Sequence, residues 1–457
     1  MSTVLLVHAK GGPPLGHVLS RTAARADVHL LALSALPPAV AGSAGRLCAS
    51  VTTPRDAGRR DLVSLIVSQA REVGANAVVT FSEYAVVAVA EACEKLGLPG
   101  AGAAAALARD KRLMRSTWQR SGLPQPAFRP VATQADLQEA VDSLSCPLLL
   151  KAAWSAGSTA HQIITSPGEA SAAWTRSRQV MAESAQLGYA ELHVAEADAD
   201  FVVEEIVEGT AADWFDEPGW GDYLSVEGVV ADGVFHPVCL SGRMPTIEPF
   251  TERAGITPAL LSPDAQDRVV DLARRAVDAL GLRDCGTHTE IKLGPDGSMW
   301  LIETAARFGG AMTVPQIEEV FALDLVGMLV DHLLGRPVAW PEQALTPAQA
   351  RGAAGSLVVL AVDGRGEAWQ DRKVWDFPVV ASDVPLSPGS ELSVVAESSL
   401  PDGSVVPVYD PAAGANTMAA LCLLSAADPR TVLQDFETLV DALPRVLPAA
   451  QSKEVSA

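Results

Sequence analysis

The sequence has few cysteines, few aromatic residues and no long hydrophobic run. Its 457 residues include six cysteines, and aromatic residues make up 5% of the chain. No two cysteines form a Cys-x-x-Cys pair, so we expect reduced, mostly buried thiols, with neither a disulfide framework nor a zinc site. No apolar run reaches the ~18 residues that a membrane span needs. The first residues lack a cationic leader and have too short an apolar run for a signal peptide. We therefore expect a cytoplasmic protein with no membrane partner.

Positive charge is also scarce. Lys and Arg number 34 against 55 Asp and Glu, which gives a formal net charge of −21. This charge excludes nucleic acid as a partner, because nucleic acid binds through cations that neutralise its phosphates. A small anionic ligand in a local basic pocket is compatible with it. The 48% hydrophobic content excludes wholesale disorder, and the length predicts roughly three domains.

The order of apolar segments predicts an α/β N-terminal region followed by mixed α+β structure. Short apolar runs at 4–7, 28–33 and 77–81 alternate with helical patterns at 15–25, 61–73 and 84–96. Apolar strands separated by helices are typical of a parallel sheet covered on both faces. The glycine-rich stretch Gly11–Gly16 lacks the G-x-G-x-x-G spacing, so we interpret it as a tight turn, with nucleotide binding there as the less favoured alternative.

The segment Gly286–Glu303 carries the strongest chemical signal. Asp296-Gly297 between two strand-like runs predicts a two-residue hairpin turn. In that register Glu290 lies directly opposite Glu303 on one face, with Cβ atoms roughly 4.5–5.5 Å apart. Opposed carboxylates repel one another unless a cation lies between them, and Mg²⁺ accepts such ligands together with substrate phosphates. The hairpin therefore predicts a magnesium site; the alternative is a solvated face with two unrelated acids.

Two more polar residues share the face of Glu290. His288 and Lys292 alternate with it along the strand and form a polar stripe on an otherwise apolar segment. His288-Thr289-Glu290 also matches the H-x-E pattern of zinc deaminases, but the P-C-x-x-C partner is missing, which excludes that class.

Three cationic residues stand beside flexible or glycine-rich backbone. Lys111 lies on a basic helical stretch, and Lys151 ends an apolar strand before a Gly/Ser loop. A lysine beside backbone N–H donors suits phosphate, although exposed lysines at strand ends are common. Arg307 follows the second acidic strand and precedes Gly309-Gly310. Its guanidinium suits a carboxylate or phosphate; the alternative is a structural salt bridge.

Taken in order, these pieces resemble the ATP-grasp superfamily, and within it the L-amino-acid ligases of the bacilysin-synthetase type. The general pattern comprises Lys111, Lys151 with its loop, Glu204-Glu205-x-x-Glu208-Gly209, Glu290 and Glu303. The ligase-type signatures are His288–Lys292, Ile302–Gly310 and Phe250-Thr251-Glu252 followed by Pro258. The resemblance implies an ATP-grasp fold in four units: an N-terminal Rossmann-like domain (1–103), a small subdomain or lid (104–210), a large subdomain with the metal site (211–349) and a C-terminal α+β lobe (350–457).

The resemblance also implies a role for each site residue. The nucleotide set comprises Lys111 and Lys151 on the phosphates, a lid containing Gly157 and Ser158, and Glu204 with the backbone of Glu205 and Val207 on adenine. Glu290 and Glu303 hold Mg²⁺, two ions being expected. Glu252 and Arg307 hold the amino and carboxylate ends of an amino acid, and Arg307 with Gly309 and Gly310 stabilises the oxyanion.

The chain departs from the family pattern at three places. Ala305 replaces the asparagine that serves many ATP-grasp proteins as a third metal ligand, a loss that the amino-acid ligases share. Thr210-Ala211-Ala212 replaces the acid that often binds ribose, and Asp213 and Glu227 are open alternatives for it. Gly255 and Ala311 stand where bulkier residues are expected, which implies a roomier substrate pocket.

The resemblance implies ATP-dependent peptide-bond formation through an acyl phosphate, ATP giving ADP and phosphate. We expect an amino acid or similar acid as donor, an amino acid or peptide as acceptor, and a homodimer that serves antibiotic biosynthesis. A purine-pathway or biotin-carboxylase-like ligase and a non-catalytic nucleotide-binding protein are the alternatives. We expect the acidic, aromatic loop 213–220 to act as a second lid, and the last hundred residues to cover the substrate cleft.

Overall fold

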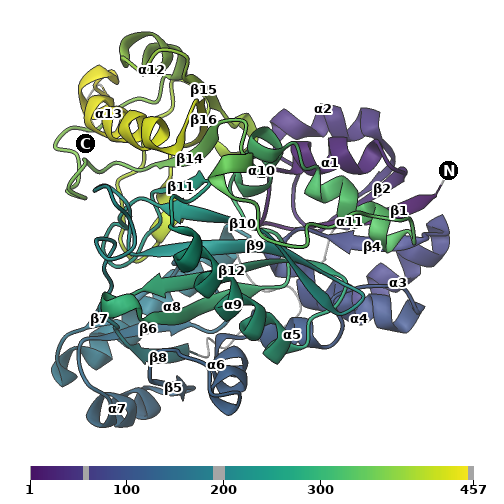
Figure 1. Ribbon diagram of the computed structural model, residues 1–457, viewed down its shortest axis with the longest axis horizontal. Helices are drawn as coiled ribbons and strands as arrows, with labels where there is room; N and C mark the ends of the chain where they lie inside the picture. Colours follow the sequence, from purple (N-terminus) through teal and green to yellow (C-terminus); the bar gives the residue numbers. More distant parts are fainter. Residues whose placement is uncertain (1, 55–60, 189–200, 451–457) are drawn as a thin grey trace, which may run out of the picture.

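The computed structural model describes residues 2–54, 61–188 and 201–450 of the chain. Three sheets organise this part (Figure 1). Their strand orders are β3-β2-β1-β4, β5-β8-β6-β7 and β13-β12-β9-β10-β11-β14-β16-β15.

The N-terminal sheet is parallel and covered on both faces, which confirms the prediction. Its strands are β1 (Thr3–His8), β2 (Asp27–Ala32), β3 (Cys48–Thr52) and β4 (Ala77–Thr80). Val4 and Leu6 face one core, built with α1 (Leu15–Ala23), α2 (Pro38–Leu47), α10 (Thr313–Phe321) and α11 (Leu325–Leu333). Leu5 and Val7 face the other, built with α3 (Leu62–Val73) and α4 (Val86–Leu96). The segments that form α2 and β3 were not recognised from the sequence.

The small sheet is antiparallel and carries helices on one face. Its strands are β5 (Phe128–Val131), β6 (Leu148–Ala152), β7 (Gln162–Ile164) and β8 (Phe201–Glu205). Helices α7 (Gln134–Ser143) and α8 (Ala170–Gln186) pack together on it and enclose a core of their own. Strand β8 ends at Glu205, the second acid of the Glu204-Glu205 pair.

The large sheet has eight antiparallel strands, and the C-terminal strands belong to it. They are β9 (Tyr223–Ala231), β10 (Val234–Arg243), β11 (Ala254–Thr257), β12 (Cys285–Leu293), β13 (Met299–Ala305), β14 (Ala353–Val359), β15 (Glu391–Val394) and β16 (Ala420–Ala426). Helix α9 (Pro263–Leu280) packs on the end that holds the β12–β13 hairpin, and α13 (Pro429–Val446) packs on β11, β14 and β16. The remaining α-helices are α5 (Ala104–Arg109), α6 (Lys111–Arg120) and α12 (Phe377–Asp383).

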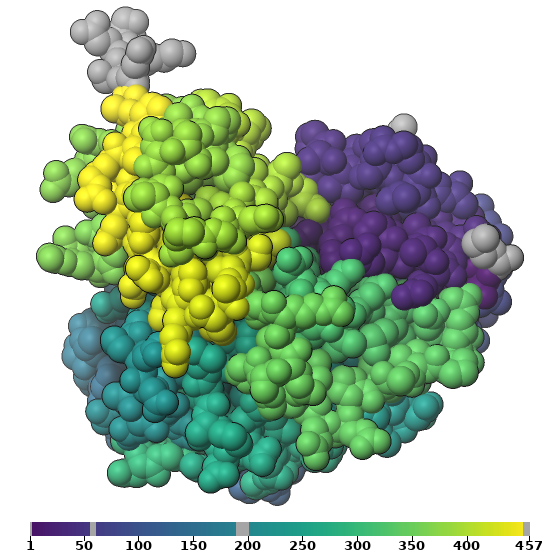
Figure 2. All heavy atoms as spheres, turned by 45° about the horizontal axis from the view of Figure 1, so that its top comes forward, coloured from purple at the N-terminus to yellow at the C-terminus, as the bar shows by residue number. Residues whose placement is uncertain are grey.

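The C-terminal segment also contacts the N-terminal domain. Figure 2 shows the green-to-yellow C-terminal residues meeting the purple N-terminal residues on one face of the molecule. The Glu397 carboxylate accepts hydrogen bonds from the backbone N–H groups of Leu15 and Gly16, at 2.8 and 3.0 Å. These are the first residues of α1, whose free N–H groups and dipole favour an anion.

The acidic, aromatic loop 213–220 is not a lid, contrary to expectation. Trp214, Phe215 and Trp220 are buried in the largest apolar core. The rings of Phe215 and Trp220 stack with centroids 4.9 Å apart, and the Trp214 indole donates to the carbonyl of Gly294 at 2.8 Å. Three buried aromatic rings anchor this loop, so it cannot open without exposing them.

The cysteines are reduced and mostly buried, as the sequence predicts. All six cysteines are free; Cys146 is exposed, Cys48 is half-buried and the other four are buried. Within the described ranges, no helix is both long and apolar enough to cross a membrane.

Candidate active site

A cavity of about 440 Å³ is lined by residues from all three sheets and their loops. It brings together most of the site residues predicted from the sequence: Lys111, Lys151, Gly157, Ser158, Glu204, Glu205, Val207, Glu252, Glu290, Glu303, Arg307, Gly310 and Ala311. These residues span nearly 200 positions of the chain. The fold brings them together in one cavity. The roles assigned to them remain predictions.

The β12–β13 hairpin places Glu290 directly opposite Glu303, as predicted. The predicted two-residue turn is wrong. The turn has three residues, Pro295–Gly297, closed by a hydrogen bond from the Gly294 N–H to the Ser298 carbonyl at 2.8 Å. Near the turn the pairing is therefore shifted by one residue, and a bulge at Ile302 restores the register. A bulge adds one residue to one strand, so the two changes cancel at the glutamate pair.

The two glutamates have different neighbours. Glu303 lies 3.3 Å from the Lys111 ammonium, and Glu290 lies 3.3 Å from Nε2 of His288. Nδ1 of His288 lies 2.7 Å from the buried Glu227 carboxylate. Burial by itself would lower the pKa of His288, but Glu227 and Glu290 outweigh burial and raise this pKa to about 9. Both ring nitrogens of His288 are thus engaged by carboxylates, and the two opposed glutamates suit the oxygen preference of Mg²⁺.

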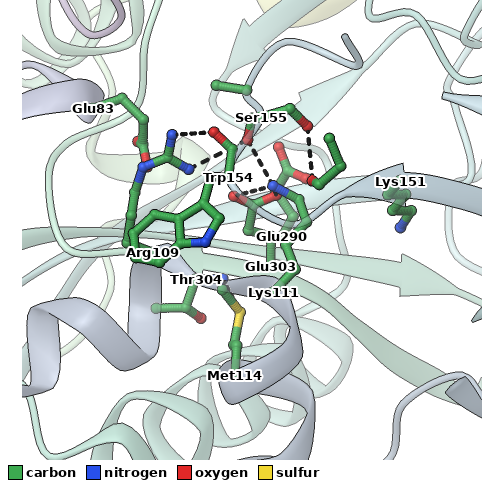
Figure 3. Close-up of polar contacts among 12 residues, drawn as sticks. Glu83, Arg109, Lys111, Met114, Lys151, Trp154, Ser155, Glu290, Glu303 and Thr304 are labelled. Carbon is green, nitrogen blue, oxygen red and sulfur yellow. Dashed lines mark hydrogen bonds and ion pairs between the residues drawn. The ribbon is translucent and has the colours of Figure 1, made fainter. Parts of the chain in front are cut away.

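The two lysines enter the cavity from different elements. Lys111 is the first residue of α6, after Asp110, whose side chain caps the helix. Its ammonium donates to the Ser155 carbonyl at 2.7 Å and approaches Glu303, as Figure 3 shows, while Lys151 lies to one side. The Lys151 ammonium instead contacts Glu204 at 2.7 Å.

Glu204 is held by a second cation that the sequence reasoning missed. Nε and Nη2 of Arg115 donate to its two oxygens at 2.6 and 3.2 Å. All three side chains of the Arg115–Glu204–Lys151 group are at most 10% exposed. Burial alone would raise the pKa of Glu204, but Arg115 and Lys151 hold it well below its usual range. The available signal was spacing, because Arg115 lies four residues after Lys111 and hence on the same face of α6.

Arg307 is oriented by Glu83 of the N-terminal domain, a residue that the sequence analysis did not identify. Its Nε pairs with Glu83, and its Nη1 donates to the Phe308 carbonyl at 2.8 Å. Glu83 is 3% exposed and also pairs with Arg109 at 3.4 Å. Arg109 in turn donates to the carbonyl of Trp154 at 2.5 Å, at the start of the Gly/Ser loop (Figure 3). One buried carboxylate thus links three segments around the cavity, and nothing in the local pattern singles out a lone glutamate after β4.

Glu252 pairs with Arg243, a third missed residue. Nε of Arg243 lies 3.1 Å from the Glu252 carboxylate, and Nη2 donates to Ser225 at 2.9 Å. The Arg243 side chain is 3% exposed, but that of Glu252 is 37% exposed. Glu252 therefore keeps carboxylate surface available to a ligand. Gly255 does not line the cavity, contrary to its expected place in the pocket wall; a Cβ there would lie 3.4 Å from Nη1 of Arg243 and 3.6 Å from Oε1 of Glu252.

Gly309, Asp213 and Glu227 were expected to contact a ligand, but the structure places all three outside the cavity lining. Gly309 does not line the cavity: a Cβ there would lie 2.7 Å from Oγ1 of Thr313, so packing requires the glycine. Asp213 accepts a hydrogen bond from a backbone N–H in the hairpin turn, and Glu227 is buried against the imidazole. Neither lines the cavity, so neither is placed to bind ribose. Gly12 does line it, and a Cβ there would lie 2.0 Å from the carbonyl of Phe81, which supports the tight-turn interpretation.

The Gly/Ser loop is held both by the segment that precedes Glu252 and by the C-terminal lobe. The Ser158 hydroxyl donates to the Phe250 carbonyl at 2.9 Å, and the Asn416 amide donates to the Thr159 hydroxyl at 3.1 Å. Asn416 also lines the cavity, together with further C-terminal residues. This agrees with the expectation that the last hundred residues cover the cleft.

Comparison with known families identifies the fold. Residues 144–315 match the model of the ATP-grasp domain, and residues 36–100 match that of the ATP-grasp N-terminal domain. The chain therefore carries both domains and has the ATP-grasp fold. The L-amino acid ligase from Bacillus licheniformis shares this fold, with a TM-score of 0.73, 18% identity and coverage of 98% of both chains.

Two relatives of known activity match over part of their length. The chain is 36% identical over 290 residues to the alanine–anticapsin ligase of Bacillus subtilis strain 168, covering 62% of this chain and 60% of that protein. It is 29% identical over 317 residues to carnosine synthase 1 of Gallus gallus, covering 65% of this chain and 31% of that protein. The matched region thus spans less than two thirds of either relative.

Proposed function

We propose that this protein is an ATP-dependent carboxylate–amine ligase that makes a peptide bond. The observation that carries the proposal is the opposed Glu290–Glu303 pair beside Lys111, in one cavity with Glu252 and Arg307. Glu290, Glu303 and Lys111 suit a nucleoside triphosphate with magnesium. Glu252 and Arg307 suit the two charged ends of an amino acid. The matches to alanine–anticapsin ligase and carnosine synthase support this reaction class.

The nucleotide would lie between the small sheet and the hairpin. Lys111, Lys151 and the backbone of the Gly157-Ser158 loop would contact phosphates. If Lys151 turned to the phosphates, it would free a position on Oε2 of Glu204 for the adenine amino group, while Arg115 continued to donate to both oxygens of Glu204. Backbone groups of Glu205 and Val207 would complete adenine recognition. Glu290 and Glu303 would hold magnesium, two ions being our expectation, and the metal supplies positive charge to the phosphates.

The reaction needs a better leaving group than the oxygen of a free carboxylate. A carboxylate oxygen attacks the γ-phosphorus and ADP leaves, giving an acyl phosphate; an amine then attacks the acyl carbon and phosphate leaves. Glu252 would hold the ammonium of an amino acid, and Arg307 its carboxylate. Arg307 and the backbone N–H of Gly310 would stabilise the oxyanion, and Ala311 keeps this side of the cavity open. A closed cavity protects the acyl phosphate from water.

Other outcomes of the same fold are the alternatives. A purine-pathway or biotin-carboxylase-like ligase is less well supported, because Ala305 stands in place of the expected third metal ligand. A protein that only binds nucleotide would not need the opposed glutamates. We further propose a homodimer that acts in antibiotic biosynthesis, on the strength of the likeness to alanine–anticapsin ligase.

Phosphate release from Mg-ATP across a panel of amino-acid pairs and short peptides tests the proposal. Product masses are read in parallel, and Glu303→Gln serves as the blank. We expect at least one pair to release phosphate and to give a product with the mass of both substrates minus water. ATP binding without phosphate release above the blank for any pair would refute the ligase assignment.

A further inference from the structure

Part of the cavity wall is apolar. Val358 of β14, Leu421 of β16 and the nearby Met418 all line the cavity. Val358 and Leu421 are directly paired across the two strands, so their side chains share one face of the sheet. Leu357 and Cys422, the next pair, point to the opposite face and join the core beneath α13.

Leu421 serves this wall and none of the cores found among the described residues. Its side chain is 3% exposed, yet it packs in none of the apolar clusters of the described chain. Val358 and Met418 are only partly buried, so the wall keeps apolar surface on the cavity side, and Leu421 packs beside them as part of the same wall. Covering this surface with an apolar group is therefore favourable, at a free energy proportional to the area covered.

The position of the wall separates it from the metal end of the cavity. In the large sheet, β14 is four strands away from β12, which carries Glu290. At about 4.8 Å per strand, this is roughly 19 Å measured along the sheet. The wall instead adjoins Glu252, because the backbone N–H of Val358 donates to the carbonyl of Arg253 at 2.8 Å. No contact assigned above to ATP, magnesium or the ends of an amino acid uses Val358, Met418 or Leu421.

We propose that Val358, Met418 and Leu421 form a subsite for the apolar side chain of one amino-acid substrate. This inference rests on the proposed function, since it names a property of one of the two molecules that the ligase joins. The ammonium on Glu252 and the side chain on this wall then belong to the same amino acid. The C-terminal strands thus set which side chains the enzyme accepts.

The test is a chain-length series in each substrate position: glycine, alanine, 2-aminobutyrate, norvaline and norleucine. Each methylene that enters an apolar site should raise kcat/KM about four-fold. We expect this rise in one position, and we expect Leu421→Ala to flatten or shift it. Leu423→Ala is the matched control, because Leu423 lies two residues along the same strand and is not in the cavity wall. Val358→Thr, which keeps the shape and adds a hydroxyl, should lower the preference with little effect on folding.

Two results would overturn the inference. One is a flat chain-length series in both positions by an active enzyme, and the other is an equal effect of Leu421→Ala and Leu423→Ala. If no pair turns over, the proposed function fails, but the subsite is still tested by the rise in Tm that the same series produces in the presence of ATP. A rise that grows with chain length and disappears in Leu421→Ala supports the subsite, and equal rises for glycine and norleucine refute it.

Discussion

The buried group around Glu204 offers the sharpest test of the site's electrostatics. Glu204→Gln removes one negative charge and, among the residues that the structure describes, leaves Arg115 and Lys151 with no counter-charge at contact distance; the glutamate is 2% exposed. Removing one partner of a buried ion pair costs about 3–5 kcal/mol. At roughly 2–4 °C per kcal/mol for a unit of 150–250 residues, this predicts a fall in Tm of roughly 6–20 °C.

Scanning calorimetry of the unliganded protein measures this change, with Glu205→Gln as the matched control. Glu205 is the next residue on β8, and its carboxylate accepts an exposed hydrogen bond from the N–H of Ser145 at 2.8 Å. The control should move Tm by no more than about 2–4 °C, since exposed polar contacts are worth about 1 kcal/mol or less. A Glu204→Gln Tm within that range of the wild type would refute the argument that this ion pair is structurally required.

The sign of the pH dependence follows from the lowered pKa of Glu204. A carboxylate with a lowered pKa contributes stability above its ordinary pKa of about 4.3 and loses it as pH falls through the lowered value. The difference in Tm between wild type and Glu204→Gln should therefore be the same at pH 8 and pH 6. A difference that shrinks between these two values would contradict the assignment.

Three further changes have defined outcomes. Gly209→Ala should weaken nucleotide binding with little change in Tm, because the new Cβ would lie 2.1 Å from Oδ2 of Asp222 and displace this flexible side chain of the cavity wall. Titration with ATP and calorimetry measure the two effects. Arg307→Lys should lower the kcat of phosphate release on the order of 100-fold, because one ammonium cannot replace a guanidinium that already makes two protein contacts. The hydrogen bond to Asp284 raises the pKa of His332. The stabilisation by its charge is complete below about pH 6.5 and is lost as pH rises through the raised pKa, so His332→Gln should lower Tm more at pH 6 than at pH 9.

Each of these changes has a control or a contrary result. Gly168→Ala matches the first, because a Cβ at Gly168 would meet nothing within 4 Å and neither ATP binding nor Tm should fall. For the arginine, an unchanged kcat with a raised KM alone would place Arg307 in ground-state binding and not in catalysis. For the histidine, an equal loss of Tm at both pH values would show that its charge does not matter.

The elements whose contacts are local could be predicted from the sequence. The glutamate pair follows from two alternating strands around an Asp-Gly turn, and it survives an error of one residue in the turn because a bulge compensates. The parallel N-terminal sheet follows from apolar runs that alternate with amphipathic helices, since both faces of such a sheet must be covered. Lys111 and Lys151 were identifiable by their order along the chain relative to these elements.

Which distant residues share the cavity depends on how the whole chain packs. Glu83 approaches Arg307 from 224 positions away in the chain, and no periodicity encodes such a pairing. The sequence pattern also did not reveal the partner of the C-terminal strands. It predicts a separate lobe, but these strands extend the sheet of the glutamate hairpin and supply the apolar wall at Leu421. Local patterns record which face of an element is apolar, whereas the partner of each face is set by how the whole chain packs. For that reason the charged residues of this site were partly visible in the sequence, and their counter-charges and the apolar wall were not.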